Sequence, residues 1–74
     1  MTEERAIAEY IRDFRKKHKL SQEQLAEKCN VSIDTISHLE REIANPSLKT
    51  LRALASFMGT TIIGILQGRQ DKSD

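Results

Sequence analysis

The sequence predicts an all-α domain of five short helices. Apolar residues recur three and four positions apart, serine, threonine, asparagine and glycine mark the helix ends, and the alternation typical of strands is absent. The chain has 74 residues, the size of one small domain. We expect residues 1–68 to form the domain and residues 69–74 to form a polar, disordered tail.

The first helix is expected over Glu3–His18. Ile7, Ile11 and Phe14 form its apolar stripe, and Tyr10 lies at the margin of that stripe. The stripe needs a burial partner, so this helix should pack along the rest of the domain.

The second helix begins after Ser21, because Ser21 and Gln24 form a capping-box pattern. Asn30 suits the left-handed backbone of a tight turn, and Val31 follows it as a buried residue. Ser32 is a good N-cap for the third helix. The residues of the second helix expected to face the core are Leu25, Ala26 and Cys29.

The third helix covers Ile33 to about Arg41, with Ile36 and Leu39 facing inward. A fourth helix follows Asn45 and Pro46, with Ser47 as its N-cap and Gly59 as its stop. Its inward residues are Leu48, Leu51, Leu54, Ala55 and Met58. Thr61 caps a fifth helix that ends at Gly68, and its inward residues are Ile62, Ile65 and Leu66.

The segment Ser21–Glu40 therefore reads as two helices joined by a short turn. Two steeply crossing helices need a small residue where they touch, and Ala26 supplies one. The expected shared core beneath both helices is Leu25, Cys29, Val31, Ile36 and Leu39. This arrangement is a helix-turn-helix, whose second helix can enter the major groove of DNA.

Residues 20–26 (LSQEQLA) resemble the opening of the phage repressor and Cro-type helix-turn-helix family, the xenobiotic-response-element-like regulators. VS at 31–32, IS at 36–37, LE at 39–40 and NPSL at 45–48 continue the pattern in register. The resemblance runs from about Ile7 to Leu66 and implies a compact, lambda-repressor-like DNA-binding domain. Asn30 and Glu42 depart from it, since both stand where the family commonly has glycine.

One side of the third helix carries the candidate DNA contacts. His38 can donate to guanine, Asp34 can accept from cytosine N4, and Ile33 can touch a thymine methyl group. The resemblance places the family's base-reading positions on these same residues. Each residue has an alternative role. The carboxylate of Asp34 can simply interact favourably with the dipole at the start of the helix, His38 can be a solvated polar residue, and Ile33 can be an isolated apolar residue on the surface.

Contacts to the DNA backbone are expected first from Gln22, which opens the second helix. The resemblance implies that Gln22 binds a phosphate and braces the third helix. Further candidates are Ser37, Arg41, Asn45, Ser47 and Lys49. The alternative for Ser47 is plain helix capping. The resemblance also implies an ion pair between Arg15 and Glu40, and the alternative is two solvated surface charges.

The formal net charge is +1, so any basic surface must come from the distribution of charges. A basic cluster lies at the end of the first helix: Arg12, Arg15, Lys16, Lys17 and Lys19. It is either part of a nucleic-acid-binding face or a solvated helix end.

Enzymatic, metal-binding and membrane-spanning functions have little support. His18, His38 and Cys29 lack metal-ligand spacing, no glycine-rich phosphate loop is present, and no apolar stretch is long enough to span a membrane. The acidic N-terminus differs from a signal peptide. We expect a cytoplasmic protein that is not an enzyme, with no cofactor and no small-molecule ligand.

The leading interpretation is a sequence-specific regulator that binds double-stranded DNA, by default a repressor without a further ligand domain. A homodimer is expected through the fifth helix, because Ile63 makes that helix apolar on more than one side; the alternative is that Ile63 packs under the first helix. The expected dimer surface is Phe57, Ile62, Ile63 and Leu66. The second interpretation is a protein-interaction module on the same fold, an antitoxin or adaptor, which the near-neutral charge, Asp34 and Glu42 favour.

Overall fold

The computed structural model describes residues 2–67, which form five helices. They are α1 (Glu3–His18), α2 (Gln22–Cys29), α3 (Ile33–Glu40), α4 (Leu48–Met58) and α5 (Ile62–Leu66). No strand occurs in this part of the chain, so the all-α prediction is confirmed. Gly68, expected to end α5, and the expected tail of residues 69–74 lie outside the described residues.

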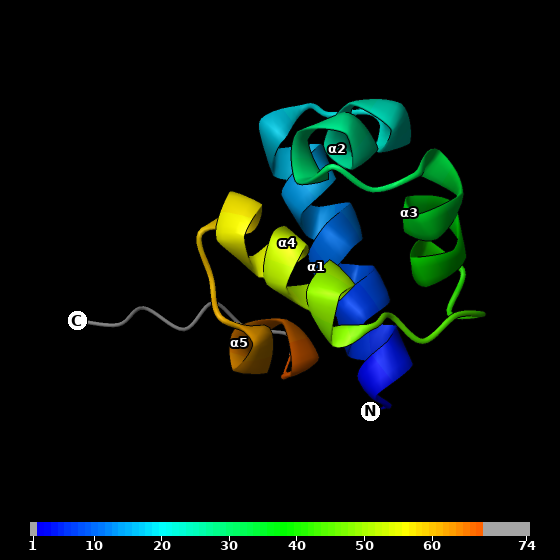
Figure 1. The fold of residues 1–74 in the computed structure, drawn as a ribbon, viewed down its shortest axis with the longest axis vertical. Coiled ribbons are helices and arrows are strands. Elements are labelled where there is room, and N and C mark those ends of the chain that lie inside the picture. Colours follow the sequence, from blue (N-terminus) through cyan, green and yellow to red (C-terminus); the bar gives the residue numbers. More distant parts are fainter. Residues whose placement is uncertain (1, 68–74) are drawn as a thin grey trace.

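Helix α1 runs through the middle of the molecule, and the other helices pack around it (Figure 1). It contacts α3 and α5, while α2 contacts α3 and α4, and α4 also contacts α5. Helices α2 and α3 lie toward one side of the molecule, and α5 lies near the end at which α1 begins. The stripe of α1 therefore supports both the α2–α3 unit and the C-terminal helices.

Every helix begins with a serine or threonine whose side chain accepts a hydrogen bond from the backbone amide three residues later. These N-caps are Thr2, Ser21, Ser32, Ser47 and Thr61. The capping box of α2 is complete, because the Ser21 N–H donates to Gln24 Oε1 at 2.8 Å. The sequence predicts all of these caps except Thr2.

Four residues that follow helices adopt a left-handed backbone: Lys19 (φ 55°), Asn30 (φ 58°), Glu42 (φ 62°) and Gly59 (φ 67°). This conformation lets the next N–H group bond back to the last helical turn, as the Leu20 N–H does to the Arg15 carbonyl at 2.8 Å. Asn30 and Gly59 are predicted at such ends. Lys19 and Glu42 are not, because neither residue type favours this conformation.

The core contains most of the residues expected to face inward: Ile7, Ile11, Leu25, Ala26, Cys29, Ile36, Leu39, Leu51, Leu54, Ala55, Met58 and Ile65. Others are half-buried against it: Tyr10, Phe14, Val31, Ile62 and Leu66. The prediction for Leu48 is wrong, since it is 56 % exposed. Side chains of a first helical turn lean toward the helix N-terminus, and only a loop precedes Leu48.

Candidate nucleic-acid interface

Helix α2, its turn and α3 form one unit with an apolar underside. Leu25 is 0 % and Ala26 3 % exposed where α2 packs against α3. The Val31 N–H donates to the Ala26 carbonyl at 2.9 Å, and the left-handed Asn30 reverses the chain between the helices. Ile36, 0 % exposed, anchors α3 from below. The structure thus contains the predicted helix-turn-helix.

The opposite side of α3 faces solvent. Ile33 is 45 % exposed, and Asp34 and His38 are also exposed. Ser37 is half-buried between them, and Arg41 is exposed just beyond the helix. The residues expected to contact bases therefore lie together on an accessible surface of a helix whose other side is fixed in the core.

Glu40, at the end of α3, is a buried carboxylate that is only 5 % exposed. Its side chain links α3 to α1 and α2. Arg15 of α1 binds its carboxylate with two hydrogen bonds, Nε to Oε2 at 2.6 Å and Nη2 to Oε1 at 2.8 Å. Gln22 of α2 donates from Nε2 to Oε1 at 3.1 Å. The hydrogen bond to Glu40 is the largest influence on the pKa of Arg15 and raises it. Burial lowers this pKa, the negative charge of Glu40 raises it further, and the net effect is a raised pKa. The structure thus brings together the pair that the resemblance implies.

A further contact at the same place involves Arg12, which sequence reasoning assigned only to the basic cluster. Its Nη1 donates to the Glu40 backbone carbonyl at 2.8 Å. That carbonyl belongs to the last turn of α3, where carbonyl groups lack helical partners and a cation is favourable. The available signal was that Arg12 lies three residues before Arg15, on the same side of α1.

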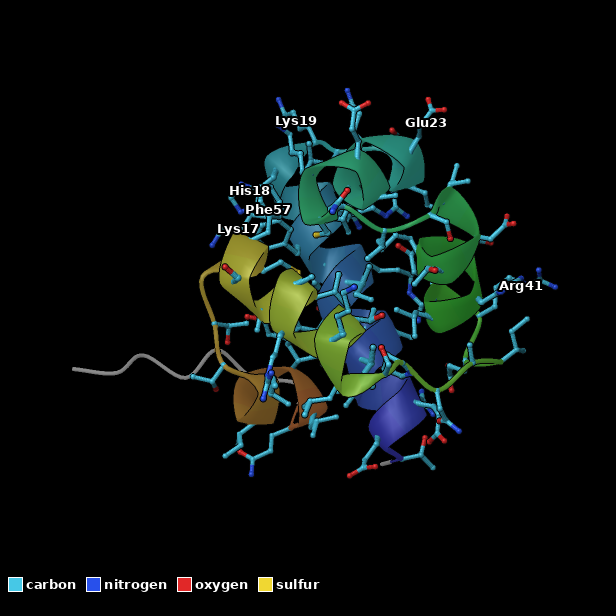
Figure 2. All side chains as sticks on the ribbon, in the orientation of Figure 1. Lys17, His18, Lys19, Glu23, Arg41 and Phe57 are labelled. Carbon is cyan, nitrogen blue, oxygen red and sulfur yellow. The ribbon has the colours of Figure 1, made fainter. Side chains whose placement is uncertain are left out.

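The candidate DNA-backbone contacts differ in accessibility. Gln22 is half-buried with its amide nitrogen bonded to Glu40, while Asn45 and Lys49 are exposed. Arg41 extends outward from the edge of the molecule that carries α3 (Figure 2). Ser47 caps α4 through the Thr50 N–H at 3.1 Å, so the capping alternative is present in the structure.

The loop after α3 accommodates Glu42 in place of the family's common glycine. Its N–H donates to the Leu39 carbonyl at 3.2 Å, and the Ile43 N–H donates to the His38 carbonyl at 3.1 Å. These two bonds hold Glu42 in the left-handed region at φ 62°. Its exposed side chain adds a negative charge next to the accessible side of α3.

The basic cluster divides in the structure. Arg12 and Arg15 bind the end of α3, so they serve the fold. Lys17 lies on the side of the molecule away from Arg41, and Lys19 lies at the end of the molecule where α2 packs (Figure 2). Lys17 is therefore not part of the surface that α3 presents.

The expected dimer surface also divides. Ile63 is 59 % exposed, which excludes its burial under α1, and Ile62 and Leu66 are half-buried beside it on α5. Phe57, near the end of α4 that lies away from α5 (Figure 1), packs against Phe14 of α1 with ring centroids 5.8 Å apart, and Lys28 Nζ lies 6.0 Å from its ring centroid. Phe57 is 38 % exposed, and its place in a dimer surface with α5 stays a prediction.

Other chemistries find no geometric support among residues 2–67. No group of three or more histidine, cysteine or acidic side chains there is placed to hold a metal ion. Burial raises the pKa of the Cys29 thiol to about 11, so the thiol is protonated at neutral pH. Within the same range, no helix has the length and apolar character needed to cross a membrane.

Comparison with known proteins agrees with this geometry. Residues 11–65 match the helix-turn-helix family model. The chain is 42 % identical over 60 residues to the immunity repressor protein of Bacillus phage phi105, covering 81 % of this chain and 42 % of that protein. It is 38 % identical over 60 residues to the control protein C.SmaI of Serratia marcescens, covering 81 % of this chain and 71 % of that protein.

A solved structure, the clp gene regulator ClgR from Corynebacterium glutamicum, has the same fold with a TM-score of 0.77 and 25 % identity, over 92 % of this chain and 72 % of that one. The chain spans less than half the length of the phage repressor and of DdrOP3, an HTH-type transcriptional regulator of Deinococcus deserti. Because residues 11–65 match its family model, this chain belongs to the helix-turn-helix family, as the resemblance to phage repressors predicts.

Proposed function

We propose that this chain is a sequence-specific DNA-binding regulator of transcription that acts as a repressor, with α3 in the major groove. The observation that carries this proposal is the exposed side of α3, held rigidly by its buried side and by the Glu40 contacts. A reading helix must be both accessible and fixed in orientation. The repressor and regulator names of the relatives support the same function.

Ile33, Asp34 and His38 supply the base contacts in this proposal. His38 donates to guanine, Asp34 accepts from cytosine N4, and Ile33 packs on a thymine methyl group, each worth about 1–3 kcal/mol of discrimination. The exposed side of α3 that carries these three residues includes the negative charge of Asp34. Base contacts alone therefore attract the DNA phosphates weakly.

Phosphate contacts therefore supply much of the affinity. Arg41 and Lys49 provide exposed cations on either side of the loop after α3, and Asn45 lies within that loop. Gln22, Ser37 and Ser47 add polar groups at helix ends. Because Arg12 and Arg15 bind Glu40, they hold the reading helix rather than the DNA.

A homodimer through α5, centred on Ile63 with Ile62 and Leu66, completes the proposed regulator. Two copies place two reading helices in successive major grooves, with half-sites about 34 Å apart or a multiple of that distance. Such a regulator works where the DNA of a prokaryotic cell lies, in the cytoplasm.

Salt-dependent binding to random-sequence duplex DNA tests the proposal. We expect binding at low salt with a steep negative slope of log affinity against log salt, reduced by about one in Lys49→Ala. Lys17→Ala is the matched control, because it removes a lysine from the opposite edge and should leave the slope unchanged. Absence of binding at low salt would favour the protein-interaction module instead.

A further inference from the structure

A pocket lies between the turn that joins α2 to α3 and the first half of α4. Its volume is about 340 Å³, within the range of about 300–1,000 Å³ that small-molecule sites occupy. The polar residues that line it are Asn30, Ser32, Thr35, Lys49 and Thr50. Because these residues come from the turn, from α3 and from α4, no local sequence pattern marks the pocket.

The other lining residues are apolar: Cys29, Val31 and Ala53. Cys29 is 3 % exposed and behaves as a small apolar residue, and the other two are half-buried. The apolar part of a small molecule can therefore pack inside the pocket while a polar group meets the hydroxyl and ammonium groups.

The polar lining offers hydrogen-bond donors. Thr50 Oγ1 accepts from Ser47 Oγ at 3.1 Å, which leaves the Thr50 hydroxyl proton available to a ligand. Ser32 Oγ and Thr35 Oγ1 lie 2.8 Å apart, so one of their two hydroxyl protons joins them and the other is available. Lys49 adds an ammonium group that forms no salt bridge within residues 2–67. The pocket thus has three donor groups: Lys49, Thr50 and the Ser32–Thr35 pair.

Among the described residues that line the pocket, Lys49 is the only charged one. Along the chain, the nearest charged residues outside the lining are Lys28, Arg52, Asp34 and Glu27. These two cations and two anions balance, so the preference for an anionic ligand comes from Lys49 and the hydroxyl donors. A cationic ligand would meet Lys49 with no carboxylate in the lining to offset the repulsion.

We propose that this pocket, here named the turn pocket, binds a phosphate monoester of a small molecule. A monoester phosphate presents three acceptor oxygens and carries a charge of about −1.5 to −2 at neutral pH, which matches one ammonium group and two hydroxyl donors. A carboxylate and the diester of a DNA backbone each present only two such oxygens. Hydrogen bonds to a charged acceptor are stronger than those between neutral groups, so the three donor groups give the site its selectivity.

Binding in the turn pocket has a consequence for DNA. Lys49 pairs with the monoester and, in the proposed function, with a phosphate of DNA, so the two ligands compete for one ammonium group. The bound monoester also places negative charge beside Ser32, directly before α3, where it repels the DNA backbone. The monoester therefore lowers the affinity for DNA. This consequence rests on the proposed function, whereas the pocket itself does not.

The test records amide chemical shifts of the ¹⁵N-labelled full chain during titration with phenyl phosphate, whose ring suits the apolar lining. We expect saturable shifts at Ser32, Thr35 and Thr50. Binding should weaken about tenfold in Thr50→Val, which removes one donor to a charged acceptor, and at least as much in Lys49→Met. Thr60→Val is the matched control and should bind normally, because Thr60 is outside the lining and its buried hydroxyl has no hydrogen-bond partner within residues 2–67.

Three results would overturn the proposal. The first is the absence of saturable shifts in the wild type. The second is equal binding of phenyl phosphate by the wild type and Thr50→Val. The third is benzoate binding as tightly as phenyl phosphate, because a carboxylate cannot use all three donor groups.

Duplex DNA distinguishes the two sources of phosphate. At constant ionic strength, saturating phenyl phosphate should weaken binding of random duplex by the wild type but not by Lys49→Met. If phenyl phosphate fails to bind while Thr50→Val weakens duplex binding, the pocket holds a backbone phosphate and the monoester is excluded. A wild type that binds phenyl phosphate but no duplex would support the turn pocket and contradict the proposed function.

Discussion

Glu40 shows how much one side chain contributes to the geometry of α3. It is a carboxylate almost without solvent contact, and it is bound by Arg15 and Gln22 while its carbonyl is bound by Arg12. A buried charge is stable only while its partners are present, because its water has been removed. The orientation of α3 therefore depends on groups from α1 and α2 that need not touch DNA.

Replacing Arg15 by alanine should lower the free energy of unfolding by about 3 kcal/mol, because it leaves Glu40 buried with its main partner gone. Urea denaturation measures the change. Arg5→Ala is the matched control, since it breaks the exposed Arg5–Glu9 pair and should cost about 0.5 kcal/mol or less. Equal effects of the two substitutions would contradict the role given to Glu40.

Cys29 gives the fold a defined dependence on alkaline pH. Its thiol has a pKa of about 11 in the folded chain against the ordinary 9.0. Between these values the unfolded chain releases the thiol proton and the folded chain keeps it, so stability falls as pH rises, by at most about 1.4 kcal/mol per pH unit. Denaturation of the wild type and of Cys29→Ala across this window measures the difference. Parallel pH curves for the two proteins would exclude the effect.

At the scale of elements, helix starts could be predicted from the sequence and helix ends only in part. Serine and threonine caps act through hydrogen bonds within four residues, so Ser21, Ser32 and Ser47 are recognisable from local sequence. The left-handed Lys19 and Glu42 are not, because the hydrogen bonds that hold them outweigh their intrinsic preference.

In the candidate site, too, local sequence predicts some features and tertiary packing determines others. Helical periodicity was enough to place Ile33, Asp34 and His38 on the exposed side of α3. The Arg12 contact and the position of Phe57 depend on how α1 and α4 lie in space, which no local pattern encodes. Resemblance to a family supplied the Arg15–Glu40 pair, whose members are 25 residues apart.

Two substitutions of Glu42, just after α3, distinguish the effect of its left-handed backbone from the effect of its negative charge. Glu42→Gly should stabilise the fold by about 1 kcal/mol, because glycine adopts the left-handed backbone without a side-chain penalty. It should also strengthen binding to random duplex DNA by removing an anion near α3. Glu42→Gln is the control and should strengthen DNA binding without the gain in thermal stability. A gain in stability by both variants would show that backbone strain is not the cause.

For the whole molecule, the distribution of surfaces matters more than the net charge of +1. The exposed side of α3 and the apolar residues of α5 belong to different elements of one small fold (Figure 1). Contacts made at one of these surfaces can therefore leave the other accessible.

The dimer belongs to this scale. Light scattering at high concentration should give twice the chain mass of 8.4 kDa for the wild type and the single mass for Ile63→Asp, because a carboxylate cannot be buried in an apolar interface. Ile43→Asp is the matched control, since Ile43 is equally exposed at 60 % but lies outside α5. A wild type that stays at the single mass would exclude the dimer through α5.

Selection from a random duplex DNA library tests the central claim, that α3 reads base sequence, most directly. The account predicts that the wild type enriches a defined site and that His38→Ala changes the preferred base at part of that site while the rest is kept. Lys17→Ala should select the wild-type site. The account would be contradicted if the wild type enriched no sequence, or if His38→Ala and Asp34→Ala both selected the wild-type site unchanged.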